Sequence, residues 1–206
     1  MKPRSRPLLR HAGYTVVELM MAISLFAIGV TAIIALQKVT VTANQHAKNL
    51  AIATRIAQSW QEMLAADAVQ WNHPSAQISS SDIDDTAWLK NVSPTPAWFQ
   101  PAWNDDLQFG PAFDALGNPV LLPTNAAQAN FCTHIRLSNL YPSTEAEGNL
   151  GNGLIRTEVR VFWRRPGVDN NEAFCSNAIL ASAIGDKLQE YYFVYKASAV
   201  RQNLLQ

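Results

Sequence analysis

An apolar run from Tyr14 to Leu36 constrains this chain more than any other feature of its sequence. At about 1.5 Å of rise per helical residue, the run is long enough to cross a hydrocarbon core of roughly 30 Å. Basic residues and no acidic residue precede it, which predicts that the amino terminus stays in the cytoplasm and that the rest of the chain lies beyond the membrane. A cleaved secretory signal peptide fits less well, because its apolar core spans only about 7 to 15 residues. The run therefore predicts a single transmembrane helix followed by an exported domain.

Glu18 is the only charged residue in this run. An isolated carboxylate in hydrocarbon costs a few kcal/mol or more, so Glu18 requires either a partner or access to water. One interpretation is that it lies close enough to the cytoplasmic interface to be hydrated. The other is that a positive group lies beside it within the apolar medium.

The residues around Glu18 resemble the type IV prepilin signature. The resemblance consists of a basic leader, Gly13, the sequence Tyr-Thr-Val-Val-Glu-Leu and a following apolar stretch. It implies that residues 1–13 are a leader peptide, that prepilin peptidase cuts between Gly13 and Tyr14, and that the new amino terminus of Tyr14 is methylated. Tyr14 replaces the commoner phenylalanine, and Val16-Val17 replaces Leu-Ile, but both changes preserve apolar bulk.

The resemblance also supplies a partner for Glu18. In this family the apolar helices of many subunits form the core of a helical filament, and the glutamate neutralises the terminal amine of a neighbour. The resemblance thus implies a docking role for Glu18, with other pilins or pseudopilins, prepilin peptidase and an inner-membrane assembly platform as partners. It also implies a location in the bacterial inner membrane, with the carboxyl-terminal domain in the periplasm, and later in a pilus or pseudopilus.

The helix is expected to continue well beyond the apolar run. Small and apolar residues recur at spacings of three and four, which predicts an amphipathic helix over residues 37–70. They are Val39, Ala43, Ala47, Leu50, Ala53, Ala57, Trp60 and Leu64. Pro74 marks the expected end of the helix, and residues 71–206 are expected to form a globular domain.

Period-two patterns predict strands in the last third of the chain. The clearest covers residues 154–163, where apolar and charged residues alternate, and further strands are expected at 131–137 and 190–200. Residues 74–130 are rich in turn signals, with a brief strand at 119–122 and a short helix or turn at 84–92. The predicted fold class is α+β: a long helix packed on a small antiparallel sheet, as in pilins. The sequence Glu-Val-Arg-Val-Phe-Trp followed by Arg-Arg-Pro-Gly also resembles PilV-type minor pilins.

The chain has two cysteines, Cys132 and Cys175. In an oxidising compartment a disulfide is the favoured interpretation, and free thiols are the alternative. Closing a loop of this length contributes about 3 to 4 kcal/mol in the loop-entropy model.

Motifs for catalysis are not visible. The histidines are scattered, and neither a nucleophile elbow nor a phosphate-binding glycine loop is present, so the sequence does not favour an enzyme or a bound cofactor. Acidic clusters at 81–85 and 104–106 are interpreted as solvated loops, with calcium binding as the weaker alternative.

Arginines recur on one side of the predicted strand at 154–163. Arg156, Arg160 and Arg164 share a face and are candidate contacts to nucleic-acid phosphates. Glu158 lies among them, and the chain without its leader has an acidic balance, so a solvent-facing row is the favoured interpretation.

The resemblance thus implies a minor pilin of a type IV pilus, which acts by assembly and not by catalysis. A pseudopilin of type II secretion is the nearest alternative. A DNA-binding minor pilin for uptake and a monomeric membrane-anchored binding protein are the others.

Overall fold

A computed structural model describes residues 15–71, 83–122, 124–140, 154–168, 175 and 181–201. The predicted leader, the cleavage predicted after Gly13 and the methylation predicted at Tyr14 concern residues that lie outside these ranges. The chain divides into two compact units, residues 1–47 and residues 48–206.

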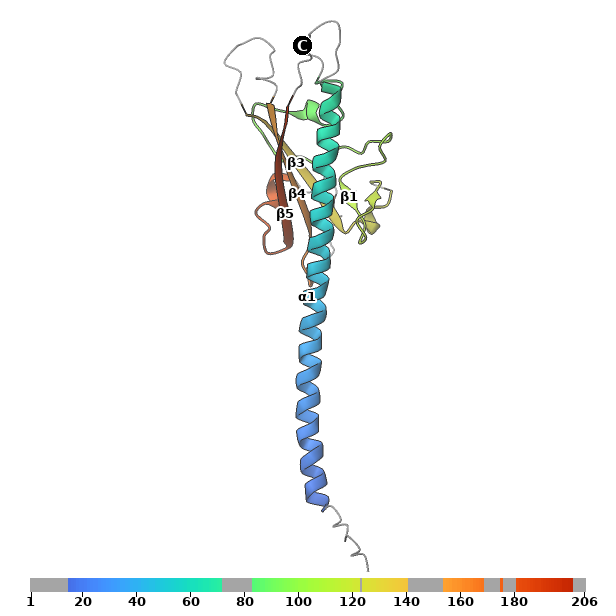
Figure 1. Cartoon of the computed structure of the whole chain (residues 1–206), viewed down its shortest axis with the longest axis vertical. Coiled ribbons are helices and arrows are strands. Elements are labelled where there is room, and N and C mark those ends of the chain that lie inside the picture. Colours follow the sequence, from blue (N-terminus) through green and yellow to red (C-terminus); the bar gives the residue numbers. More distant parts are fainter. Residues whose placement is uncertain are drawn as a thin grey trace, which may run out of the picture. The chain divides into compact units, whose positions relative to one another are not determined.

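Helix α1 (Val16–Trp71) runs without interruption for 56 residues, as predicted (Figure 1). Residues 15–71 contain no proline, so every backbone N–H of the helix interior can bond. The hydroxyls of Ser24 and Thr31 donate to the carbonyls of Met20 and Ile28, both at 2.8 Å. These bonds satisfy the two hydroxyls within the helix itself, as hydrocarbon surroundings require.

A five-stranded antiparallel sheet forms the second layer of the fold, so the predicted α+β class is confirmed. The strands are β1 (Ala112–Phe113), β2 (Pro119–Val120), β3 (Phe131–Asn139), β4 (Leu154–Arg164) and β5 (Tyr191–Arg201). Their order in the sheet is β2-β1-β3-β4-β5, with β4 paired to both β3 and β5 along its length. The strands expected at 131–137, 154–163 and 190–200 are therefore confirmed, and the brief strand expected at 119–122 is the two-residue β2.

Three short helices complete the described elements. They are η1 (Leu89–Asn91), η2 (Ala126–Gln128) and α2 (Ala181–Ile184). The first lies within the stretch 84–92, where a short helix or turn is predicted.

The inner face of the sheet packs on the last turns of α1. On the sheet side the core uses alternate residues of β4, with Ile155 and Val159 nearly inaccessible to solvent. From α1 it takes Ala53, Ile56, Ala57, Trp60, Leu64, Ala68 and Trp71. Full burial begins at Ala53, whereas the predicted stripe begins at Val39; Ile52, one residue earlier, is partly buried against the same core, and Val39 is 65% exposed.

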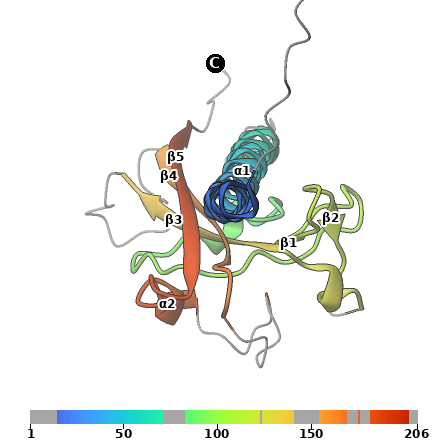
Figure 2. The same cartoon turned by 90° about the horizontal axis from the view of Figure 1, so that it is seen from below.

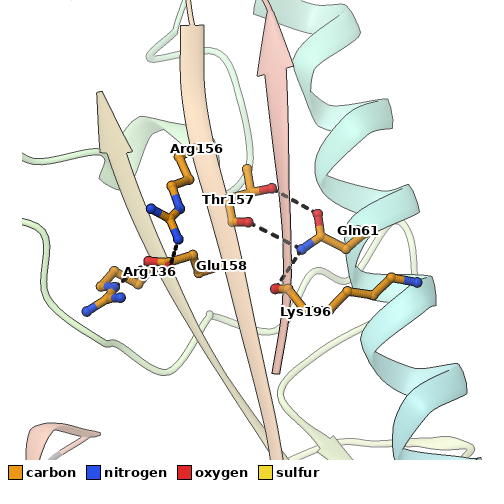
Figure 3. Close-up of polar contacts among 6 residues, drawn as sticks. All are labelled: Gln61, Arg136, Arg156, Thr157, Glu158 and Lys196. Atoms are coloured by element: carbon orange, nitrogen blue, oxygen red, sulfur yellow. Dashed lines mark hydrogen bonds and ion pairs between the residues drawn. The ribbon is translucent and has the colours of Figure 1, made fainter. Parts of the chain in front are cut away.

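Two polar side chains of α1 bind the rest of this unit. Gln61 accepts a hydrogen bond from the hydroxyl of Thr157 at 2.9 Å and donates to the carbonyl of Lys196 at 3.2 Å (Figure 3). Asp67, which is 6% exposed, accepts bonds of 2.7 to 3.0 Å from the backbone N–H groups of residues 87–89. A carboxylate that accepts the first N–H groups of a helix stabilises it, so Asp67 fixes η1 against α1.

The outer face of the sheet carries a second core at one end. Cys132 and Cys175 form a disulfide, which confirms the predicted pair, and both sulfurs are buried. Phe162 of β4, Ile184 of α2 and Tyr191 of β5 pack around them. Figure 2, in which α1 is seen nearly end-on, shows α2 farther from this helix than the strands are. The two faces of the sheet therefore support two separate cores.

Candidate functional site

The first turn of α1 contains the predicted docking residue. Glu18 is exposed, and its backbone N–H donates to the hydroxyl of Thr15 at 3.3 Å. Thr15 precedes the helix, and Glu18 occupies its third position, which is the spacing of a capping box. The pattern Thr-x-x-Glu is legible in the sequence, but the prediction of a docking glutamate did not use it. Glu18 is therefore also placed to stabilise the helix start, where negative charge is favoured.

The apolar segment that follows exposes its side chains. Val16, Leu25 and Phe26 are 74%, 71% and 72% exposed. By length and composition α1 can cross a membrane. In the described structure, the most apolar stretch of α1 has no buried residue. An apolar surface of this extent requires lipid or other apolar helices around it.

The prediction of a solvent-facing row of arginines is wrong for Arg160, because this residue is only 2% exposed. Its guanidinium lies over the ring of Trp98, with Cζ 4.5 Å from the ring centroid, and Nη2 donates to the carbonyl of Ala181. Trp98 comes from the turn-rich segment before the sheet, and Ala181 begins α2. Both cover Arg160 from elements remote in sequence, so strand periodicity gave no sign of them.

His134 lies beside Arg160 on the neighbouring strand β3. It is 3% exposed, and its Nδ1 is 2.9 Å from Nη2 of Arg160. A guanidinium can only donate, so Nδ1 accepts and carries no proton. Burial, and after it the charge of Arg160, together lower the pKa of His134 to about 3. The pair is thus a buried cation that is bound by a neutral imidazole.

Glu158 joins two further arginines of this face, Arg136 and Arg156. Its carboxylate bonds to Nε of Arg136 at 2.5 Å and to Nη2 of Arg156 at 2.9 Å (Figure 3). The hydrogen bond from Arg136 lowers the pKa of Glu158 and raises that of Arg136. Arg136 also lies over Trp98, with Cζ 4.8 Å from the ring centroid.

These residues form what we call the cationic aromatic patch. Its members are Trp98, Arg136, Arg156, Arg160 and Tyr195. The ring of Tyr195 contacts that of Trp98 with the centroids 6.0 Å apart, and Tyr195 is 56% exposed. The two accessible guanidiniums, of Arg136 and Arg156, exceed the carboxylate of Glu158 by one positive charge, and the buried guanidinium of Arg160 adds a second beneath them.

Arg164 lies apart from this patch. It lines a cleft of about 340 Å³ together with Arg165, Trp163 and Asn49. Arg165 lies over the ring of Tyr192, with Cζ 4.3 Å from the centroid, and its Nε donates to the carbonyl of Tyr191 at 3.2 Å. The three predicted phosphate contacts therefore occupy an exposed, a buried and a cleft position, and they do not form one continuous surface.

The predicted acidic clusters lie at the surface in the part of the chain that is described. Asp84 and Asp85 are exposed, as are Asp105 and Asp106. Within the described residues, His, Cys, Asp and Glu side chains do not come together in groups of three that could hold a metal ion.

Comparisons of the chain with family models, with curated proteins and with solved structures find no match.

Proposed function

We propose that this chain is a minor pilin of a type IV pilus, a filament subunit held in the membrane by α1 until it is assembled. The observation that carries the proposal is the continuity of α1. One unbroken helix contains an exposed apolar segment of membrane length, and from Ala53 onward one face of the same helix is buried against an antiparallel sheet. This arrangement presents an apolar rod for packing against identical or similar helices.

The position of Glu18 supports the same proposal. It is the only charged residue of residues 14–36 and lies in the first turn of α1, near where cleavage after Gly13 would leave the free amine of Tyr14. A carboxylate and an ammonium are each costly in an apolar medium, and they attract strongly there when paired. Pairing with the amine of a neighbouring subunit would set the register of the helices.

The first experiment measures the intact mass and the amino-terminal sequence of the protein from native membranes, with and without prepilin peptidase. A chain that begins at methylated Tyr14 only when the peptidase is present supports the proposal. A chain that retains residues 1–13 in both strains contradicts it and favours a monomeric anchored domain.

A pair of substitutions separates the docking role of Glu18 from its role at the helix start. Glutamine serves in a capping box as glutamate does, but it carries no charge. If Glu18 pairs with an amine, both Glu18→Gln and Glu18→Ala are processed normally and are absent from filaments. If Glu18→Gln enters filaments as the wild type does, the charge is dispensable and the docking role is contradicted.

A further inference from the structure

The outer face of the sheet is covered at one end only. Near the disulfide, Phe162 and its neighbours are enclosed by the second core. Toward the start of β4, Arg156 is exposed, and so are Ala197 and Ala199 on the adjoining part of β5. The cationic aromatic patch lies at this open end.

The composition and rigidity of the patch are those of a protein contact. Tryptophan, tyrosine and arginine supply most of the binding energy in protein interfaces. Glu158 holds the guanidiniums of Arg136 and Arg156 in place, and the ring of Trp98 orients Arg136 further. Little side-chain entropy is lost when such prearranged groups bind a partner. The surplus positive charge indicates a partner that presents carboxylates.

A loop of the same chain has the complementary chemistry. Asn104 and Phe109 exchange two backbone hydrogen bonds, of 2.8 and 3.2 Å, which close the loop tightly. Its tip presents the exposed carboxylate of Asp106 beside Leu107, which is 52% exposed. Within the described part of the chain no hydrogen bond or ion pair engages the Asp106 side chain, whereas Asp105 accepts a bond from Nε1 of Trp103.

The loop and the patch lie on different sides of the sheet. Phe109, at the base of the loop, packs on Trp60 of α1, with ring centroids 4.8 Å apart. The loop therefore belongs to the inner side, whereas the patch is on the outer face. A contact between them joins unlike surfaces of two copies, and such a head-to-tail contact can repeat along a helical array.

We propose that the cationic aromatic patch of one copy binds the Asp106–Leu107 tip of a second copy of this chain. Asp106 faces the guanidiniums of Arg136 and Arg156, and Leu107 lies on the rings of Trp98 and Tyr195. The inference rests on the proposed filament function and identifies the surfaces by which the globular units meet.

The test is photo-cross-linking of the full-length chain in native membranes, with a benzophenone amino acid at Tyr195. The expected result is a light-dependent adduct of twice the chain mass, in which mass spectrometry finds the tryptic peptide that contains Asp106. Asp106→Lys should lower the adduct yield roughly tenfold, because it places like charges opposite each other. Asp85→Lys, a charge reversal in another exposed loop, is the matched control and should leave the yield unchanged.

A charge exchange completes the test. Here the copy that carries the cross-linker at Tyr195 also carries Arg156→Glu. Its adduct yield with wild-type partners should be low. Its adduct yield with Asp106→Lys partners should recover most of the wild-type value. An adduct with a different protein, an adduct insensitive to Asp106→Lys, or no adduct overturns the inference. The mass of the same samples separates the two proposals. Chains that begin at Tyr14 but form no adduct overturn the inference alone, and chains that retain the leader overturn the proposed function as well.

Discussion

The two faces of β4 differ sharply in polarity, yet both are buried over much of their length. The inner face carries Ile155, Val159 and Val161, which pack against α1. The outer face carries Arg156, Glu158, Arg160 and Phe162, of which Arg160 and Phe162 are buried.

The inner face is buried mainly by apolar transfer, which needs no particular partner, and its one buried hydroxyl, that of Thr157, donates to Gln61. On the outer face a charged group is buried, and this is tolerated only where acceptors and rings have been placed around it. The two faces should therefore differ in which changes lower the stability of the fold. On the inner face these are substitutions that remove side-chain volume. On the outer face they are substitutions that remove a partner of a buried polar group, and acidification.

The largest effect is expected from Trp60→Ala on the inner side. Trp60 is fully buried and meets the rings of Trp88 and Phe109. Its loss should lower the free energy of unfolding by about 3 to 5 kcal/mol, measured by denaturant unfolding of the detergent-solubilised chain. Val69→Ala, at an exposed position of the same helix, is the control. Because Nε1 of Trp60 lacks a hydrogen-bond partner in the described structure, Trp60→Phe should cost far less. If Trp60→Phe and Trp60→Ala lower the free energy of unfolding equally, packing is not the cause.

Arg160→Ala should destabilise the outer face by about 2 to 3 kcal/mol. The substitution leaves the carbonyl of Ala181 and the imidazole of His134 without their donor and opens a void under Trp98. Arg156→Ala removes the same residue type two positions away, where half of the side chain is exposed, and should cost less than about 1 kcal/mol. If the two variants lose the same stability in unfolding experiments, Arg160 behaves as a surface residue.

Acidification should weaken the outer face before the inner one. The pKa of His134 is about 3 in the folded chain and 6.5 in the unfolded one, so between these values only the unfolded state binds the proton. Stability should therefore fall as pH drops below 6.5, by up to about 1.4 kcal/mol per pH unit. The lowered pKa of Glu158 acts in the same direction, since its contribution to stability is present above the ordinary glutamate pKa of 4.5 and is lost as pH falls through its lower folded pKa.

The measurement is a series of unfolding curves between pH 7 and 4. His134→Gln has no titrating imidazole and should be nearly flat above pH 5, whatever its absolute stability. A slope equal to that of the wild type would assign the pH dependence to other groups.

The smallest effect is expected at the contact between α1 and the sheet edge. Gln61→Ala removes the bonds to Thr157 and Lys196 and should cost about 1 kcal/mol. Glu62→Ala, at the exposed neighbouring position, should change stability by less than about 0.5 kcal/mol. Thermal unfolding of the two variants side by side distinguishes a polar bond from a general effect on the helix.

Much of the fold was predictable because its signals are local. The apolar run, the absence of proline and the alternation at 154–163 each lie within one element and are set by helix and strand geometry. The pair of cysteines allows only one intramolecular bond. The capping box at Thr15 is equally local.

The candidate site was less predictable because its partners are distant in sequence. In the sequence nothing distinguishes Asp67 from a surface carboxylate of a helix. Its role depends on the fold, which brings the backbone N–H groups of residues 87–89 to its side chain. Trp98 lies in a stretch that reads as irregular, yet it covers two arginines of the sheet.

The sequence by itself determined the long helix, its segment of membrane length, the three long strands and the inner face of β4. Only the tertiary structure decided that Arg160 is buried while Arg156 is exposed, although both follow the same alternation. The reason is physical. Periodicity assigns a residue to a face, but its burial depends on which remote segment covers that residue, and here Trp98 and α2 cover Arg160 and leave Arg156 exposed.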